Sequence, residues 1–132
     1  MPTPDAAPTT LYLISDLHIG GDGALDRCAF ERELIALLGD LARGPADAEL
    51  IIVGDAFGLW ELSDQAGESK LATIAANHPG LFAQLRTTGE RVKITLLPGN
   101  PDYDLACVPA YATELARWNV VLEARESVTR RI

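Results

Sequence analysis

The sequence predicts an α/β domain with a largely parallel sheet. Short apolar segments alternate with amphipathic helical segments, residues 50–53 are apolar throughout, and no repeat or linker divides the chain. A strand covered on both faces is apolar at every position, which is typical of parallel sheets. Alternating strands and helices build such a sheet from βαβ units. A length of 132 residues is that of one domain.

The composition narrows the classes of function open to the chain. It carries 19 acidic and 11 basic residues, a net charge of −8, which disfavours a nucleic-acid-binding surface and a surface for anionic membranes. An acidic protein can still bind phosphates when metal ions reverse the local field. No apolar run approaches the ~20 residues of a membrane span, and no secretory signal is visible at the N-terminus. We therefore expect a cytoplasmic protein without a membrane span.

The predicted domain covers residues 10–132. Residues 1–9 hold three prolines among mostly small side chains, which predicts a flexible tail. Cys28 and Cys107 have neither the density of a disulfide scaffold nor the spacing of zinc ligands. Both are expected to be reduced, mostly buried thiols.

The first strand is predicted over residues 11–14, as a buried strand of apolar and β-branched side chains. It leads into an acidic, glycine-rich loop that starts with Asp16 and His18 and ends at residue 23. Residues 20–23 superficially resemble a phosphate-binding turn, but their spacing does not fit a dinucleotide fingerprint. Asp22 is close enough in sequence to contribute to a site at the end of this strand, but we expect it to be a solvated loop acid.

Two helical segments follow with an amphipathic pattern. The first ends at the Gly-Pro pair of residues 44–45, and its apolar stripe consists of Phe30, Leu34, Leu37, Leu38 and Leu41. After the strand at residues 50–53, the second covers residues 67–88 with a break near 77–79. Its buried face is predicted to consist of Leu71, Ile74, Leu81, Phe82 and Leu85. Gly89 is the expected C-cap, and His78 is expected to have a surface or capping role.

The remainder of the chain repeats the alternation. A strand over residues 92–97 runs into Asn100, and a helix carrying Tyr111, Leu115 and Trp118 at helical spacing comes next. A last strand over residues 120–122 precedes a basic end.

Metal-capable side chains follow three successive strands. Asp16 and His18 come after the first strand, Asp55 after the second and Asn100 after the third. Residues i and i+2 of extended backbone point to the same side, so Asp16 and His18 can reach one ion. Carboxylate and imidazole ligands suit Mn²⁺, Fe or Zn²⁺ better than Ca²⁺. Because sites of parallel α/β sheets lie at the carboxyl ends of strands, we expect these four side chains to form a site. The alternative is that they are turn formers.

These residues resemble the calcineurin-like metallophosphoesterases. The Asp-x-His block at residues 16–18, the Gly-Asp block at 54–55 and the Gly-Asn block at 99–100 occur in that family's order. Residues 54–60 look most like the block of UDP-diacylglucosamine pyrophosphatase-type members. The resemblance implies a four-layer α/β sandwich around two divalent ions, Mn, Fe or Zn. It also implies that Asp16 and His18 hold one ion, Asp55 bridges both and Asn100 holds the second.

The implied activity is hydrolysis of a phosphoester or pyrophosphate by metal-activated water, on a phosphorylated small molecule or ester. Two departures from the family pattern bear on it. Pro101 stands where the family usually has a histidine, and a proline can donate no proton. The family's second half supplies further histidines, whereas this chain has two, His18 and His78. The chain therefore looks like the N-terminal half of such a domain, and we expect negligible turnover from it alone.

Two other classes of function stay open at this point. A catalytically degenerate relative would act as a weak metal-binding or protein-interaction domain. A nucleotide-binding module without metals would need a phosphate-cradling loop that the sequence lacks. Phe57 and Trp60 are expected to be core or cap residues, and an exposed Trp60 would be free to contact a leaving group. The oligomeric state is not predicted.

Overall fold

The computed structural model describes residues 10–15, 17, 19, 30–54, 56–57, 69–99, 110–123 and 129–130. The elements are β1 (Thr10–Ile14), α1 (Glu31–Arg43), β2 (Ala48–Val53), α2 (Ser69–Asn77), α3 (Pro79–Gly89), β3 (Lys93–Leu97), α5 (Ala110–Ala116) and β4 (Val120–Leu122). The described strands form one sheet in the order β1-β2-β3-β4, and every neighbouring pair is parallel. The predicted α/β class with a parallel sheet is confirmed.

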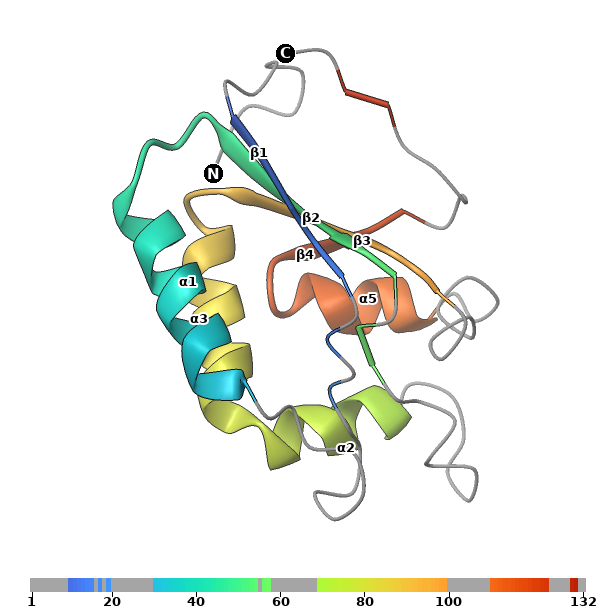
Figure 1. The fold of residues 1–132 in the computed structure, drawn as a ribbon. Coiled ribbons are helices and arrows are strands. Elements are labelled where there is room, and N and C mark those ends of the chain that lie inside the picture. Colours follow the sequence, from blue (N-terminus) through green and yellow to red (C-terminus); the bar gives the residue numbers. More distant parts are fainter. Residues whose placement is uncertain are drawn as a thin grey trace.

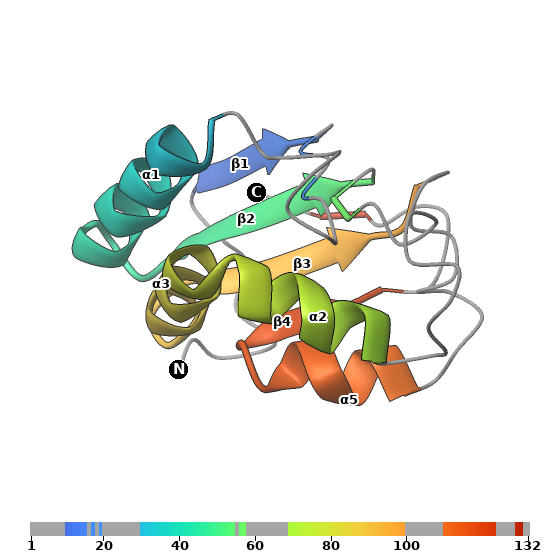
Figure 2. The same ribbon diagram turned by 90° about the horizontal axis from the view of Figure 1, so that it is seen from below.

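The described helices lie on one side of this sheet. Figure 1 shows α1, α3 and α5 against the same face, with α2 running past their ends, and Figure 2 shows the same layer from below. The strand order explains this arrangement. Crossover connections are right-handed, so a sheet that grows in one direction without reversal places each crossover helix on the same face.

The hydrophobic core lies between this helical layer and the sheet. Two rows of side chains cross the sheet by register and face the helices: Tyr12, Leu50, Ile94 and Val120, and then Ile14, Ile52, Leu96 and Leu122. The predicted inner faces of the helices are largely confirmed, with these residues buried: Leu34, Leu38, Leu41, Leu71, Ile74, Leu81, Phe82, Leu85, Tyr111 and Leu115. Phe30 is an exception. It precedes α1 and is 39% exposed, because the stripe begins one turn later.

The prediction that the first strand is buried is wrong. β1 is an edge strand of the described sheet, and Leu13 is 64% exposed. Leu13 pairs with Ile51, whose side chain points away from the helices. We call this side the helix-free face; it bears Leu13, Glu49, Ile51, Val53, Thr95, Leu97 and Val121. An apolar sequence alone cannot distinguish an edge strand with one uncovered face from a central one.

Two predicted boundaries also differ. β2 begins at Ala48 and therefore includes Glu49, which is 3% exposed. Gly89 is the last residue of α3, and Glu90 takes the C-cap position. Glycine is needed at 89 for space, because a Cβ there would lie 2.7 Å from the carbonyl oxygen of Asn119.

His78 is buried, contrary to a surface role. It stands at the N-cap position of α3, but its side chain makes no cap hydrogen bond. Its Nδ1 instead lies 2.6 Å from Oε1 of Glu31. The contact ties the start of α1 to the junction of α2 and α3.

Several predictions fall on residues that the structure does not describe. The tail at residues 1–9, Asp22, Cys28, Cys107, Trp60 and Pro101 lie outside the described residues. Among the described helices, none combines the length and apolarity that a membrane crossing requires.

Candidate metal centre

The predicted ligands Asp16, His18, Asp55 and Asn100 all lie outside the described residues. The structure does describe their chain neighbours, namely Ser15, Leu17, Ile19, Gly54, Ala56 and Gly99. These neighbours frame the candidate site on both sides.

The chain segments that contain Asp16, His18 and Asp55 lie between two β-pairings that have the same register. Ile14 pairs with Ile52 at the end of β1, and Ile19 forms a parallel bridge with Phe57, so both pairs are 38 residues apart (14 with 52, 19 with 57). The Ile19 N–H donates to the carbonyl oxygen of Ala56, with an N···O distance of 2.8 Å. Pairing therefore resumes in register after residues 15–18 and 53–56. The segments that carry Asp16, His18 and Asp55 are anchored at both ends.

The bridging residues are held by the core. Leu17, Ile19, Ala56 and Phe57 are buried, and the Phe57 ring stacks on Phe82 with centroids 5.9 Å apart. Phe57 is thus a core residue, as expected. Buried side chains on both segments fix the backbone beside the predicted ligands.

The ends of β2 and β3 touch through their backbones. Gly54 has a φ of +73°, a left-handed conformation that L residues with a side chain rarely adopt. A Cβ at Gly54 would lie 3.2 Å from the Cα of Gly99, 3.5 Å from its nitrogen and 3.7 Å from the carbonyl oxygen of Pro98. Asp55 and Asn100 thus each follow one glycine of a contacting pair.

The spacing of the strands decides whether ligands at adjacent strand ends could share one ion. Neighbouring strands lie ~4.8 Å apart, and metal–ligand bonds of Zn-type ions are ~2.0–2.2 Å. Side chains that start from adjacent strand ends can therefore meet at one ion. Among the described residues, no group of three His, Cys, Asp or Glu side chains could hold a metal.

A small void lies beneath this edge of the sheet. It measures about 10 Å³ and is lined by apolar side chains that include Ile19 and Phe57. A space of that size holds no more than about one water. It is a packing void and not a ligand pocket.

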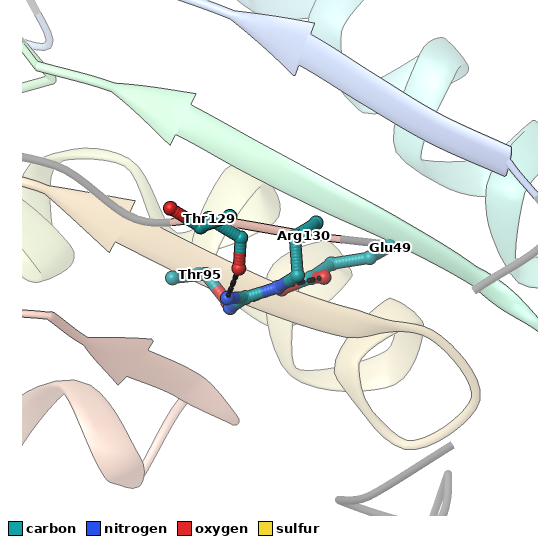
Figure 3. A network of polar contacts seen from close by, with 4 residues as sticks. All are labelled: Glu49, Thr95, Thr129 and Arg130. Carbon is teal, nitrogen blue, oxygen red and sulfur yellow. Dashed lines mark hydrogen bonds and ion pairs between the residues drawn. The ribbon is translucent and has the colours of Figure 1, made fainter. Parts of the chain in front are cut away.

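The sequence reasoning missed a polar network on the helix-free face. Arg130 donates through Nε to Oε1 of Glu49 at 2.7 Å and through Nη2 to Oε2 at 3.1 Å. The Thr95 hydroxyl donates to Oε2 at 2.7 Å. Figure 3 shows the guanidinium beside the Glu49 carboxylate and Thr95, with a further bond from Arg130 to the Thr129 carbonyl. A glutamate beside an otherwise apolar strand was the available signal.

This network changes the acidity of Glu49. Burial by itself raises the pKa of the carboxyl, but the hydrogen bonds from Arg130 and Thr95 and the positive charges of Arg130 and Lys93 outweigh it. The pKa of Glu49 therefore lies below its ordinary value of 4.5. Glu49 is near the start of β2, and the predicted ligand Asp55 follows the other end, so the network has a structural role.

Comparison with known proteins adds no relative. The chain matches no family model, no curated protein and no solved structure.

Proposed function

We propose that the chain contributes the metal centre of a metallophosphoesterase, which hydrolyses a phosphoester or pyrophosphate with a metal-activated water. One observation carries this proposal. The three segments with the predicted ligands leave adjacent strand ends that are joined by the Ile19–Phe57 bridge and by the Gly54–Gly99 contact. Residues that served only as turn formers would require no contacts between the ends of three strands.

Each predicted ligand would have a separate role. Asp16 and His18 would hold one ion, Asp55 would contribute an oxygen to each of two ions, and Asn100 would hold the second. Such ions supply positive charge to phosphoryl oxygens and lower the pKa of an attacking water. Asp55 is anionic and has two oxygens, which suits a shared ligand. Asn100 is neutral, so it leaves the centre enough positive charge to attract a phosphate.

We also propose that the domain is a four-layer α/β sandwich. The chain would form one sheet of the sandwich and the helices that cover this sheet. The helix-free face supports it. Leu13, Val53 and Val121 are 64%, 42% and 51% exposed on that face. Parallel sheets are almost always covered on both faces, so a second layer is expected there. The proposed substrate is a phosphorylated small molecule or ester, and the proposed location of the protein is the cytoplasm.

A second candidate function is a non-catalytic protein-interaction domain, a degenerate relative of the same fold. The same exposed side chains favour it, because exposed apolar side chains on one face are typical of a protein-binding surface. Mn²⁺ binding that depends on Asp55 favours the metal centre, whereas a chain that binds no Mn²⁺ favours the interaction domain.

The test is titration of the purified chain with Mn²⁺ by calorimetry. We expect about one weak site, because Asp16, His18 and Asp55 would serve the same ion. Asp55→Ala should abolish the heat of binding. Asp40→Ala, an equal charge change on a side chain 72% exposed in α1, should leave it unchanged. Equal binding by Asp55→Ala and the unmodified chain would refute the assignment.

A further inference from the structure

Gly54 and Gly99 bring the ends of β2 and β3 close together at the carboxyl edge of the sheet. Gly54 is buried and has a left-handed φ of +73°. The space where its side chain would start is filled by the Cα of Gly99 at 3.2 Å and the carbonyl oxygen of Pro98 at 3.7 Å. Backbone atoms cannot swing aside as the end of a flexible side chain can. A residue larger than glycine would therefore separate the ends of β2 and β3.

The other side of the Gly54 segment is closed as well. Two residues after Gly54, the Ala56 carbonyl oxygen accepts the hydrogen bond from Ile19, and Phe57 is held in the core. Gly54 and Ala56, the described neighbours of Asp55 in the chain, are thus each in contact with a different neighbouring segment.

We propose that Gly54 and Gly99 are positioning residues of the metal centre, and that their contact sets the position from which Asp55 would reach the ion it shares with Asp16 and His18. This inference rests on the proposed function. Paired ions in two-metal sites are ~3.5–4 Å apart, and metal–ligand distances hold within ~0.2 Å. A Cβ at 3.2 Å is closer than ordinary van der Waals contact, so its neighbour must give by a few tenths of an ångström. That displacement exceeds what ligand bonds tolerate.

The test compares two buried glycines that each pack against backbone. Gly54→Ala adds a Cβ at the carboxyl edge of the sheet. Gly89→Ala is the control for a clash away from this edge, and the clash is the more severe one, because its Cβ would lie 2.7 Å from the carbonyl oxygen of Asn119 at the end of α3. Both variants should lower the urea midpoint. Gly54→Ala alone should weaken Mn²⁺ binding by ~10–100-fold, the usual effect of losing a residue that orients metal ligands, and should alter the electron paramagnetic resonance spectrum of bound Mn²⁺.

Gly54→Asn covers the case in which Gly54→Ala fails to fold. Asparagine tolerates a positive φ but keeps the Cβ against Gly99, so it should also lose Mn²⁺ affinity. Wild-type affinity in a folded Gly54 variant, or an equal loss in Gly89→Ala, would overturn the positioning role alone. Absence of Mn²⁺ binding by the unmodified chain would overturn the proposed function together with it.

Discussion

Arg130→Met should be among the more destabilising single changes in this protein. The substitution keeps a long apolar side chain but removes both guanidinium bonds to Glu49, at 2.7 and 3.1 Å. The Glu49 side chain is 4% exposed, so its carboxylate would remain buried with only the Thr95 hydroxyl as a described hydrogen-bond partner. Because so little of the Glu49 side chain is exposed, water replaces the lost bonds only in part.

The magnitude follows from the burial of the two partners. Removing one partner of a buried ion pair costs ~3–5 kcal/mol, because the other charge stays desolvated. The Arg130 side chain is 22% exposed, which lets solvent reach the pair and favours the lower end, about 3 kcal/mol. For a domain of this size that corresponds to a fall in Tm of roughly 10 °C. Urea unfolding at pH 7 should show a lower midpoint with an unchanged slope.

Two further variants isolate the cause. Arg43→Met removes the exposed pair with Asp40, whose side chains are 73% and 72% exposed, and should have a much smaller effect. Glu49→Gln combined with Arg130→Met should be more stable than Arg130→Met alone, because a neutral amide is cheaper to bury and still accepts the Thr95 hydrogen bond.

The pH dependence has a definite sign. The pKa of Glu49 is lowered in the folded protein. The stabilisation from the ionised Glu49 carboxylate is therefore complete above the ordinary pKa of 4.5, and it is lost as the pH falls through the lower pKa of the folded state. Without Arg130, its hydrogen bond and its positive charge no longer lower the pKa of Glu49, so this pKa is higher in the variant and less stability depends on the ionised carboxylate. The difference between wild type and Arg130→Met should therefore narrow from pH 7 to pH 4. A variant within a few tenths of a kcal/mol of wild type at pH 7, or a difference that widens in acid, would refute this reasoning.

Two other outcomes are expected. Residues 1–132 alone should show negligible hydrolysis of a nitrophenyl phosphodiester with Mn²⁺, because metal-activated water needs an ion in a fixed geometry; steady turnover that Asp16→Ala abolishes would contradict this. His78→Ala should destabilise the fold by about 1–2 kcal/mol in urea unfolding, because it removes the 2.6 Å contact with Glu31 that joins α1 to the α2–α3 junction. Arg86→Ala, on the exposed side of α3, is the control, and an equal effect of both changes would show that the contact is unimportant.

The sequence by itself determined the class of fold, and the candidate site is a prediction from the sequence. The spacing of Leu34, Leu38 and Leu41 follows the helical period, and it fixed the inner face of α1 because that period is a local property of the chain. The apolar run of β2 indicated a parallel sheet for the same reason. The Asp-x-His, Gly-Asp and Gly-Asn blocks identified ligand types, since donor chemistry belongs to the residue and needs no tertiary contact.

The tertiary structure alone decided which surfaces meet. Leu13 is exposed because β1 lies at an edge and the strand order puts the described helices on one face. Glu49 is buried because Arg130, 81 residues away, closes over it. The left-handed Gly54 is explained by Gly99 at the end of the next strand. Each of these depends on chain segments brought together from far apart, and a local pattern carries no information about the partner that folding will supply.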